Sequence, residues 1–394
     1  MLTQSANAET TSGGEQIWAF QTDDSVGSSP TVVDGTVFVG SDDGNVYALD
    51  AGEGSQRWSF ETGDRVNSSP TVVDGAVFVG SDDGNVYALD AGEGSQRWSF
   101  QTGNSVFSSP TVVDGTVFAG GYGGNVYALD AGEGSERWSF EPDDSVNSSP
   151  TVVDGTVFVG SDDGNVYALD AGEGNQRWSF ETGDRVNSSP TVVDGTVFVG
   201  SDDGNVYALD AGEGNQRWSF ETDDSVGSSP TVVDGTVFVG GFDDNVYALD
   251  AGEGSQRWSF QTGNSVISSP TVVDGAVFVG SDDGNVYALD AGVDGFSEGS
   301  RVNLGTLGHH HVWAPQGSKD ANRLDSENGG ETESKGSEDA NRSDSENGGE
   351  TESSADGGTS IAALSARGGA AAGLLYLARD IIDNDDIDDT TDDH

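Results

Sequence analysis

The sequence predicts an all-β protein, a seven-bladed β-propeller made of 40-residue repeats that each form four strands. Three observations lead to this prediction. Seven of the eight tryptophans lie 40 residues apart, the segment SSPTVVDG occurs seven times from Ser28 onward, and the segment VYALDAG occurs seven times from Val46 onward. A period of about 40 residues is typical of propellers, because a single four-stranded sheet covers its faces only by packing against neighbouring copies.

The regularly spaced tryptophans are predicted to be structural. An indole ring at the same place in every repeat is expected to dock on the glycine-rich backbone of the neighbouring blade. These residues are Trp18, Trp58, Trp98, Trp138, Trp178, Trp218 and Trp258.

Each repeat contains four segments suited to strands, here called A to D from the propeller axis outward. Strands A and B flank Asp34-Gly35, a dipeptide that favours a two-residue hairpin because both of its residues readily adopt positive φ. Further turns separate B from C and C from D, and the segments are rich in Val, Phe, Tyr and Trp, as strands require. In the first repeat the strands are expected at 31–33, 36–40, 45–50 and 56–60.

The two ends of the repeat array predict how the ring closes. Segment 16–20 has the sequence of a D strand with no blade before it, whereas the seventh repeat ends after its C strand near Asp290. Because an unpaired sheet edge would otherwise stay exposed, we expect segment 16–20 to complete the seventh blade. The propeller would then occupy residues 15–292, after a flexible N-terminus at 1–14.

The composition changes after the last repeat. Residues 293–358 hold little apolar material and include a duplicated acidic segment, so we expect a disordered acidic linker and tail. Residues 359–394 are expected to form a short helix followed by an acidic end. The apolar stretch within this segment contains Arg367 and Arg379, which argue against a membrane span.

The charge of the chain excludes several classes of partner. It has 69 Asp and Glu against 15 Lys and Arg, which gives a net charge of −54. This field repels phosphate backbones and anionic lipids, so we predict no binding to nucleic acid or to bare membrane surfaces. Because concentrated salt screens such repulsion, the composition is typical of a salt-adapted, halophilic protein. There is no cysteine, so no disulfide framework is expected.

The segment from strand C to strand D resembles a known repeat. YALDAGEGSQRW is similar to the tryptophan-docking motif of the pyrroloquinoline quinone (PQQ)-like propeller family, A-x-D-x-x-T-G-x-x-x-W. The matching residues of the first repeat are Ala48, Asp50, Gly54 and Trp58. All six complete copies have Glu where the family has Thr, as at Glu53. The resemblance covers residues 15–290 and implies a propeller.

The resemblance implies two classes of function. Quinoprotein dehydrogenases of the family hold PQQ with calcium on the axis, whereas cofactor-free members resembling BamB, a propeller subunit of outer-membrane assembly, bind proteins as scaffolds. An axial active site needs one base, one metal and one substrate clamp, each placed once, but the carboxylates of these blades recur in most copies. We therefore predict a non-catalytic scaffold without a cofactor. A PQQ- and calcium-binding oxidoreductase and a cell-surface structural module are the alternatives.

Differences among the copies indicate where a partner binds. The D–A connections and the B–C loops vary most, and both lie on the same face of a propeller whose strands run from A to D. Exposed apolar residues on an acidic surface are candidate contact points, and arginines there could pair with carboxylates. The candidates are Phe107, Tyr122, Phe242, Ile267, Arg65 and Arg185. We predict a protein partner on this face and a monomeric chain.

Two segments carry side chains that bind metal ions in other proteins. The B–C loop at 42–45, Asp-Asp-Gly-Asn, presents oxygen ligands of the kind calcium uses, but the same residues form tight turns. Residues 309–311 are consecutive histidines, and neighbouring side chains on an extended chain point to opposite faces. We predict no fixed metal site in either.

The N-terminus has neither the basic nor the apolar region of a secretory signal. The localisation therefore stays open at this point. The family resemblance favours an extracytoplasmic or cell-surface location only if the start of the chain is misassigned.

Overall fold

Each repeat folds into one antiparallel sheet in the computed structural model, which describes residues 16–293. The A strands are β1 (Thr31–Val33), β5 (Thr71–Val73), β9 (Thr111–Val113), β13 (Thr151–Val153), β17 (Thr191–Val193), β21 (Thr231–Val233) and β25 (Thr271–Val273). The B strands are β2 (Thr36–Gly40), β6 (Ala76–Gly80), β10 (Thr116–Gly120), β14 (Thr156–Gly160), β18 (Thr196–Gly200), β22 (Thr236–Gly240) and β26 (Ala276–Gly280).

The outer strands follow the same order. The C strands are β3 (Asn45–Asp50), β7 (Asn85–Asp90), β11 (Val126–Asp130), β15 (Asn165–Asp170), β19 (Asn205–Asp210), β23 (Asn245–Asp250) and β27 (Val286–Asp290). The D strands are β4 (Gln56–Glu61), β8 (Gln96–Gln101), β12 (Glu136–Phe140), β16 (Gln176–Glu181), β20 (Gln216–Glu221) and β24 (Gln256–Gln261). The predicted strands of the first repeat match β1 to β4, except that β4 extends to Glu61 because that residue pairs with Asn45.

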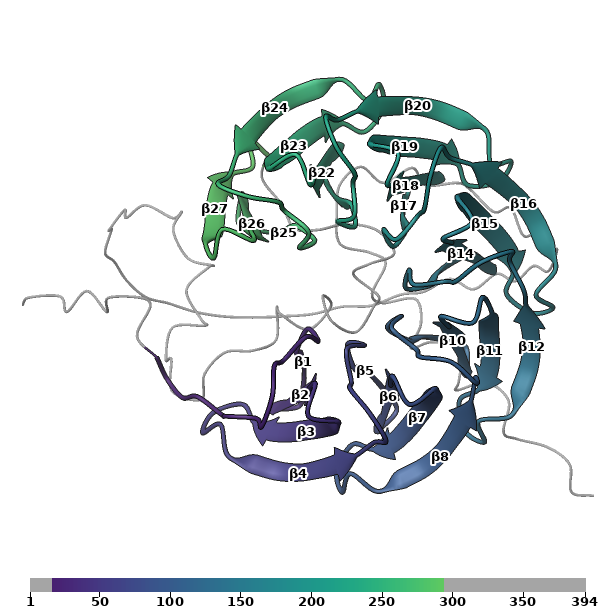
Figure 1. The fold of residues 1–394 in the computed structure, drawn as a ribbon, viewed down its shortest axis with the longest axis vertical. Coiled ribbons are helices and arrows are strands. Elements are labelled where there is room, and N and C mark those ends of the chain that lie inside the picture. The colour runs from purple at the N-terminus through teal and green to yellow at the C-terminus, as the bar shows by residue number, and fades with distance from the viewer. Residues whose placement is uncertain (1–15, 294–394) are drawn as a thin grey trace, which may run out of the picture. The chain divides into compact units, whose positions relative to one another are not determined.

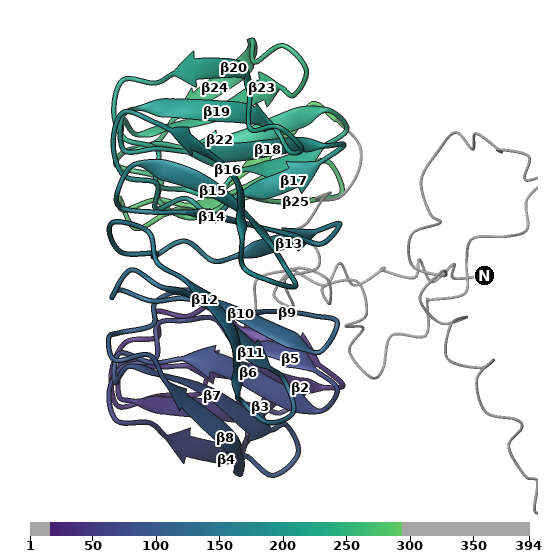
Figure 2. The same ribbon diagram turned by 90° about the vertical axis from the view of Figure 1, so that its right-hand side faces the viewer.

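The seven sheets are the blades of a propeller arranged around a common axis (Figure 1). Seen from the side, the strands run between the two faces on which the loops lie (Figure 2). The all-β prediction and the count of seven blades are therefore confirmed. None of the described residues lies in a helix, and thus none of them forms a helix able to cross a membrane.

The A–B turns have the backbone that the sequence predicts. Asp34 has φ 47° and Gly35 has φ 70°, and the corresponding Asp and Gly of every other blade also have positive φ. Such turns match the twist of the strands they join. They set the register in which Val33 pairs with Thr36 and Thr31 pairs with Phe38.

The core lies between successive blades rather than inside one sheet. One cluster joins Phe38, Val46 and Trp58 of blade 1 to Val77 and Tyr87 of blade 2, among others, and the same pattern recurs around the ring. Trp58 donates a hydrogen bond from Nε1 to the carbonyl of Ala91 in the next blade, with a length of 3.0 Å. Each tryptophan thus ties one blade to the next by apolar contact and by a hydrogen bond.

A relay of serines holds the A strands around the axis. The amide of Ser29 donates to Ser69 Oγ at 3.0 Å, and the amide of Ser69 donates to Ser109 Oγ at 2.9 Å. Equivalent bonds continue through the later blades as far as Ser269. The start of every A strand, and with it the D–A connection before it, is therefore fixed relative to its neighbours.

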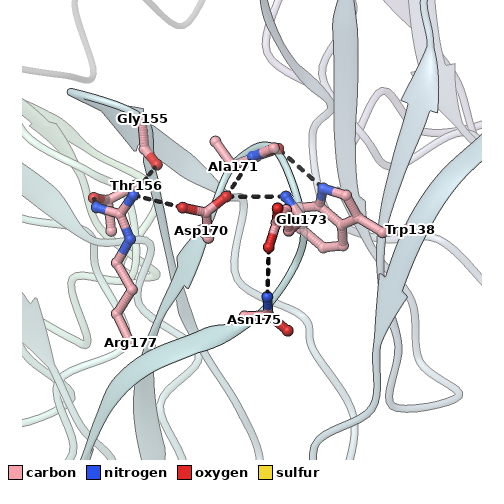
Figure 3. Close-up of polar contacts among 9 residues, drawn as sticks. Trp138, Gly155, Thr156, Asp170, Ala171, Glu173, Asn175 and Arg177 are labelled. Atoms are coloured by element: carbon pink, nitrogen blue, oxygen red, sulfur yellow. Dashed lines mark hydrogen bonds and ion pairs between the residues drawn. The ribbon is translucent and has the colours of Figure 1, made fainter.

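An arginine on the D strand anchors the C–D loop at the outer rim. In blade 4, Arg177 Nη2 donates to Asp170 Oδ2 at 2.8 Å and to the carbonyl of Gly155 at 3.0 Å (Figure 3). The other Asp170 oxygen accepts the amides of Gly172 and Glu173. The guanidinium and these amides hold the pKa of Asp170 below its usual value. Six blades have this ion pair.

The seventh blade differs from the others. It has three strands, and segment 16–20 lies in no strand, so the predicted pairing of this segment with β27 is not present. The segment instead makes the contacts that a D strand forms with the following blade, because Trp18 and Phe20 pack on the face of blade 1. As a result Phe278 is 41% exposed and Val286 is 79% exposed, whereas their counterparts Phe38 and Val46 are 2% and 0% exposed.

A hollow of about 510 Å³ lies in the seventh blade at the place where the other blades hold their arginine. Its walls include Asp274, Gly275, Ala276, Leu289 and Asp290. The predicted linker at 293–358 (apart from its first residue) and the predicted end at 359–394 lie outside the described residues, as does the N-terminus at 1–15.

Candidate partner-binding face

The D–A connections and B–C loops are joined to one another by hydrogen bonds, and together they are called here the binding face. The amide of Asp42 donates to the carbonyl of Ser25, and the amide of Val66 donates to the carbonyl of Ser41. The first bond joins the B–C loop of blade 1 to the D–A connection that enters this blade. The second joins the same loop to the D–A connection that leads from blade 1 to blade 2. The loops of the face are therefore joined in a continuous row from the connection that enters blade 1 to the loop of blade 7.

The second aspartate of the B–C loop, present in every blade except blade 3, is a structural residue. Asp83 accepts hydrogen bonds from Tyr87 Oη at 2.6 Å, from the amide of Asn85 at 2.9 Å and from the amide of Gly63 at 2.7 Å. Burial raises the pKa of this carboxyl, but the hydrogen bonds from Tyr87, Gly63 and Asn85 outweigh that effect and leave the pKa lowered. Burial, followed by the bond to Asp83, raises the pKa of the Tyr87 phenol.

The first aspartate, present in every blade except blades 3 and 6, has a different environment. Asp162 Oδ2 accepts Asn147 Nδ2 at 3.0 Å, and Asp202 Oδ2 accepts Asn187 Nδ2 at 3.2 Å. Asp162 Oδ1 and Asn147 Oδ1 are buried and have no hydrogen-bond partner among the described residues, and the same holds for Oδ1 of Asp42 and Asp82. These oxygen atoms can still accept hydrogen bonds.

Burial raises the pKa of the first aspartates in three loops, Asp82, Asp162 and Asp202. Neighbouring carboxylates add to the effect, such as Asp64 beside Asp82 and Asp144 beside Asp162. The cost of holding these charges close together falls when a cation approaches. The first aspartates are therefore the part of the face where repulsion between carboxylates is strongest and where a cation would be stabilised most.

The structure brings two of the predicted contact residues together on blade 3. The rings of Phe107 and Tyr122 meet edge to face, with centroids 5.8 Å apart and an interplanar angle of 89°. Phe107 is 37% exposed and Tyr122 is 55% exposed. Tyr122 stands where most blades have the first aspartate. Phe107 stands where blades 4 and 5 have Asn147 and Asn187, so an aromatic pair replaces a pair of asparagine and aspartate.

The other apolar candidates lie on blades 6 and 7. Phe242 also replaces a first aspartate, and a Cβ added at Gly227 would lie 3.0 Å from its ring, so glycine makes room for it. Ile267 lies on the connection that enters blade 7. Both side chains are exposed.

The two arginine candidates are exposed on the connections that enter blades 2 and 5. The carbonyl of Arg65 accepts the amide of Asp82, and that of Arg185 accepts the amide of Asp202. The positive charges offset part of the rise in the pKa of nearby first aspartates, Arg65 at Asp82 and Arg185 at both Asp162 and Asp202. The ion pairs found among residues 16–293 involve other arginines, those of the D strands.

Sequence reasoning did not select the first aspartates or the asparagines beside them as partner-binding residues. A signal was present, because the first aspartate is replaced by Tyr122 and Phe242 whereas the second is kept in blade 6 as Asp243. Only the structure shows the reason. The second aspartate is bound by tyrosine, and the first is not.

The described residues do not form a calcium centre of the kind that would accompany PQQ. Within 16–293 no group of three His, Asp or Glu side chains is arranged to hold a metal ion. The second aspartates, which have the oxygen atoms expected of calcium ligands, are engaged by tyrosine, asparagine and backbone amides.

Comparisons with known proteins identify the fold and its relatives. A family model described as the β-propeller of the β-alanine-activating enzyme matches residues 5–234, and one described as the outer membrane protein assembly factor BamB matches residues 203–296. No curated protein sequence matches the chain.

Solved structures share the fold at low sequence identity. BamB from Moraxella catarrhalis has a TM-score of 0.61 and 24% identity, covering 69% of this chain and 87% of its own. The computationally designed protein Ika8 has a TM-score of 0.61 and 20% identity, with coverages of 66% and 82%. The quinohemoprotein alcohol dehydrogenase ADHIIG from Pseudomonas putida HK5 has a TM-score of 0.58 and 18% identity, with coverages of 71% and 67%.

Proposed function

We propose that this chain, which belongs to the β-propeller family of the β-alanine-activating enzyme and is built from PQQ-like repeats of the BamB type, is a non-catalytic scaffold that holds a protein partner on its binding face. The observation that carries the proposal is the exposed pair of Phe107 and Tyr122. Aromatic side chains held rigidly at a surface are the residues on which protein interfaces most often depend.

The near-symmetry of the ring supports a scaffold over an enzyme. A catalytic centre places unlike groups once each, whereas the strongest polar arrangements here, the Tyr87–Asp83 bond and the Arg177–Asp170 ion pair, recur from blade to blade. Symmetry is broken on the binding face, where Tyr122 and Phe242 stand in place of aspartates. The acidic surface supports the further proposal that the scaffold works in concentrated salt.

Site-specific crosslinking tests the proposal. A photoreactive phenylalanine analogue at position 122 should crosslink a partner in extracts of the source cells, and the same analogue at Ser179, on the outer D strand of blade 4, is the control. Once the partner is purified, Phe107→Asp and Phe242→Asp should each weaken its binding by about tenfold or more, whereas Ser179→Asp should not. The stability of each variant should stay within about 1.5 kcal/mol of the parent, the most that a lost aromatic contact is worth. Full binding by both Phe variants would refute the assignment of this face.

A further inference from the structure

The binding face carries an apolar patch and an acidic patch side by side. The apolar patch is the aromatic pair, Phe107 and Tyr122, on blade 3. The acidic patch lies on blades 4 and 5 and consists of Asn147, Asp162, Asn187 and Asp202. The two patches are joined, because Ser145 Oγ, two residues before Asn147, donates to the carbonyl of Tyr122 at 2.7 Å.

The acidic patch is a row of acceptor atoms. Asn147 Nδ2 lies 3.0 Å from Asp162 Oδ2 and 3.5 Å from Asn187 Oδ1, so the side chains of two blades are linked into one row. Both amide donors of the row are directed to the neighbouring carboxylates. Oδ1 of Asp162 and Oδ1 of Asn147 are buried without a partner among the described residues. Arg185 offsets only part of the charge of Asp162 and Asp202, so the row still lacks hydrogen-bond donors, and donors that carry positive charge suit it best.

A metal ion is a poor occupant of the row, because the described residues supply no group of three metal-binding side chains there. An ammonium or guanidinium group fits better, since it offers several donors and is attracted by a chain whose net charge is −54. The exposed aromatic pair beside the row offers a contact for an apolar side chain on the same ligand.

We propose that the partner presents a cationic, amphipathic polypeptide segment, which places Arg or Lys over Asp162 and Asp202 and an apolar side chain on Phe107 and Tyr122. This inference rests on the proposed scaffold function and names the chemistry of its partner. The apolar contact positions the segment, and the acidic patch selects against neutral and acidic segments.

Labelled peptides of known sequence test the proposal by fluorescence anisotropy on the full chain. The probe is a peptide of alternating Arg and Leu, compared with peptides of Ser and Leu, of Asp and Leu, and of Arg and Ser. The charge variant is Asp162→Asn with Asp202→Asn, which keeps the acceptor for each asparagine. The apolar variant is Phe107→Ser with Tyr122→Ser.

A matched control separates local recognition from attraction by the net charge. Asp154→Asn with Asp194→Asn removes the same two charges from the same two blades, in the A–B turns on the opposite face, where Asn tolerates the positive φ. We expect the charge variant to bind the Arg-Leu peptide at least about tenfold more weakly, and the control less than about twofold. The apolar variant should bind the Arg-Leu peptide no better than the parent binds the Arg-Ser peptide.

Each other outcome overturns a defined part of the argument. If the Ser-Leu peptide binds as tightly as the Arg-Leu peptide and only the apolar variant weakens it, the cationic partner is wrong while the scaffold function stands. If the charge variant and the control lose affinity equally, or neither face variant loses any, the attraction is not local and this inference fails. The inference also fails if no peptide binds, and the crosslinking experiment then decides the scaffold function separately.

Discussion

Trp18 Nε1 donates a hydrogen bond of 2.9 Å to the carbonyl of Ala51, and the spacing of 33 residues is the same as in the bond from Trp58 to Ala91. Phe20 likewise meets Tyr47 edge to face at 5.2 Å, as Phe60 meets Tyr87 at 5.5 Å. The N-terminal segment therefore contacts blade 1 in the way that the D strand of each blade contacts the blade that follows it. The missing contacts of such a strand are those with β27.

The unpaired edge of β27 predicts that the seventh blade is open to solvent. A cysteine at Val286→Cys reports on this edge, because the chain has no other cysteine, Val286 is 79% exposed, and the equivalent Val206 of a complete blade is fully buried. We expect its reaction with a thiol reagent to be about as fast as that of the exposed Ser59→Cys and far faster than that of Val206→Cys. Deleting residues 1–20 should leave this rate unchanged. Slow reaction in the intact chain that becomes fast after the deletion would show that segment 16–20 pairs with β27.

The tryptophan contacts predict a steric limit at the glycine beneath each ring. A Cβ at Gly134 would lie 2.5 Å from Trp98, and Gly134 has φ 70°. Gly155 has φ 68° but has nothing within 4 Å of an added Cβ, so Gly155→Ala measures the backbone cost alone. We expect about 1 kcal/mol of destabilisation for Gly155→Ala and about 1–3 kcal/mol more for Gly134→Ala. Equal values in denaturant unfolding would mean that the docking is loose.

The tyrosine–aspartate pairs predict a loss of stability in alkaline solution. Burial, together with the bond to Asp43, raises the pKa of Tyr47 to about 12 from a model-compound value of 10.0. A raised pKa in the folded state means that this stabilisation is complete below pH 10 and is lost as the pH rises through about 12. The melting temperature should therefore fall over this interval, and Asp43→Asn should move tyrosinate absorbance to lower pH. An unchanged tyrosinate titration in that variant would contradict the role of the bond.

The acidic composition predicts that stability rises with salt. Raising potassium chloride from about 0.1 M to about 2 M reduces the distance over which charges repel from about 10 Å to under 3 Å. With a net charge of −54, the melting temperature should increase, by about 2–4 °C for each kcal/mol gained. A melting temperature that is constant or falls with salt would refute salt adaptation.

The proposed absence of a cofactor predicts that PQQ does not bind. Titration in molar potassium chloride, with and without calcium, should show neither a saturable change in quinone absorbance nor a shift in melting temperature. A ligand present at a hundredfold excess over its Kd would stabilise the fold by about 2.7 kcal/mol. Saturable binding of one quinone per chain would favour the oxidoreductase alternative and direct attention to the axis.

Much of the fold could be predicted because the information is local and repeated. Asp34-Gly35 specifies a turn through the backbone angles that these residues adopt, and the strand segments, rich in β-branched and aromatic residues, are legible within one repeat. The candidate site was predictable only in part. The exposure of Phe107 and Tyr122 followed from where the copies differ, but the orphaned oxygen of Asp162 depends on Asn147, from a different loop.

The sequence by itself determined the repeat, the strands and the face on which symmetry is broken, since each depends on residues close together in the chain. Only the tertiary structure decided that the second aspartates are bound by tyrosine, whereas the first aspartates Asp42, Asp82 and Asp162 each keep a buried oxygen without a partner among the described residues. It also showed that Trp18 docks on blade 1 while the edge of β27 stays unpaired. The physical reason is that these contacts join neighbouring blades or distant loops, and identical local sequences acquire different surroundings according to the blade that packs beside them.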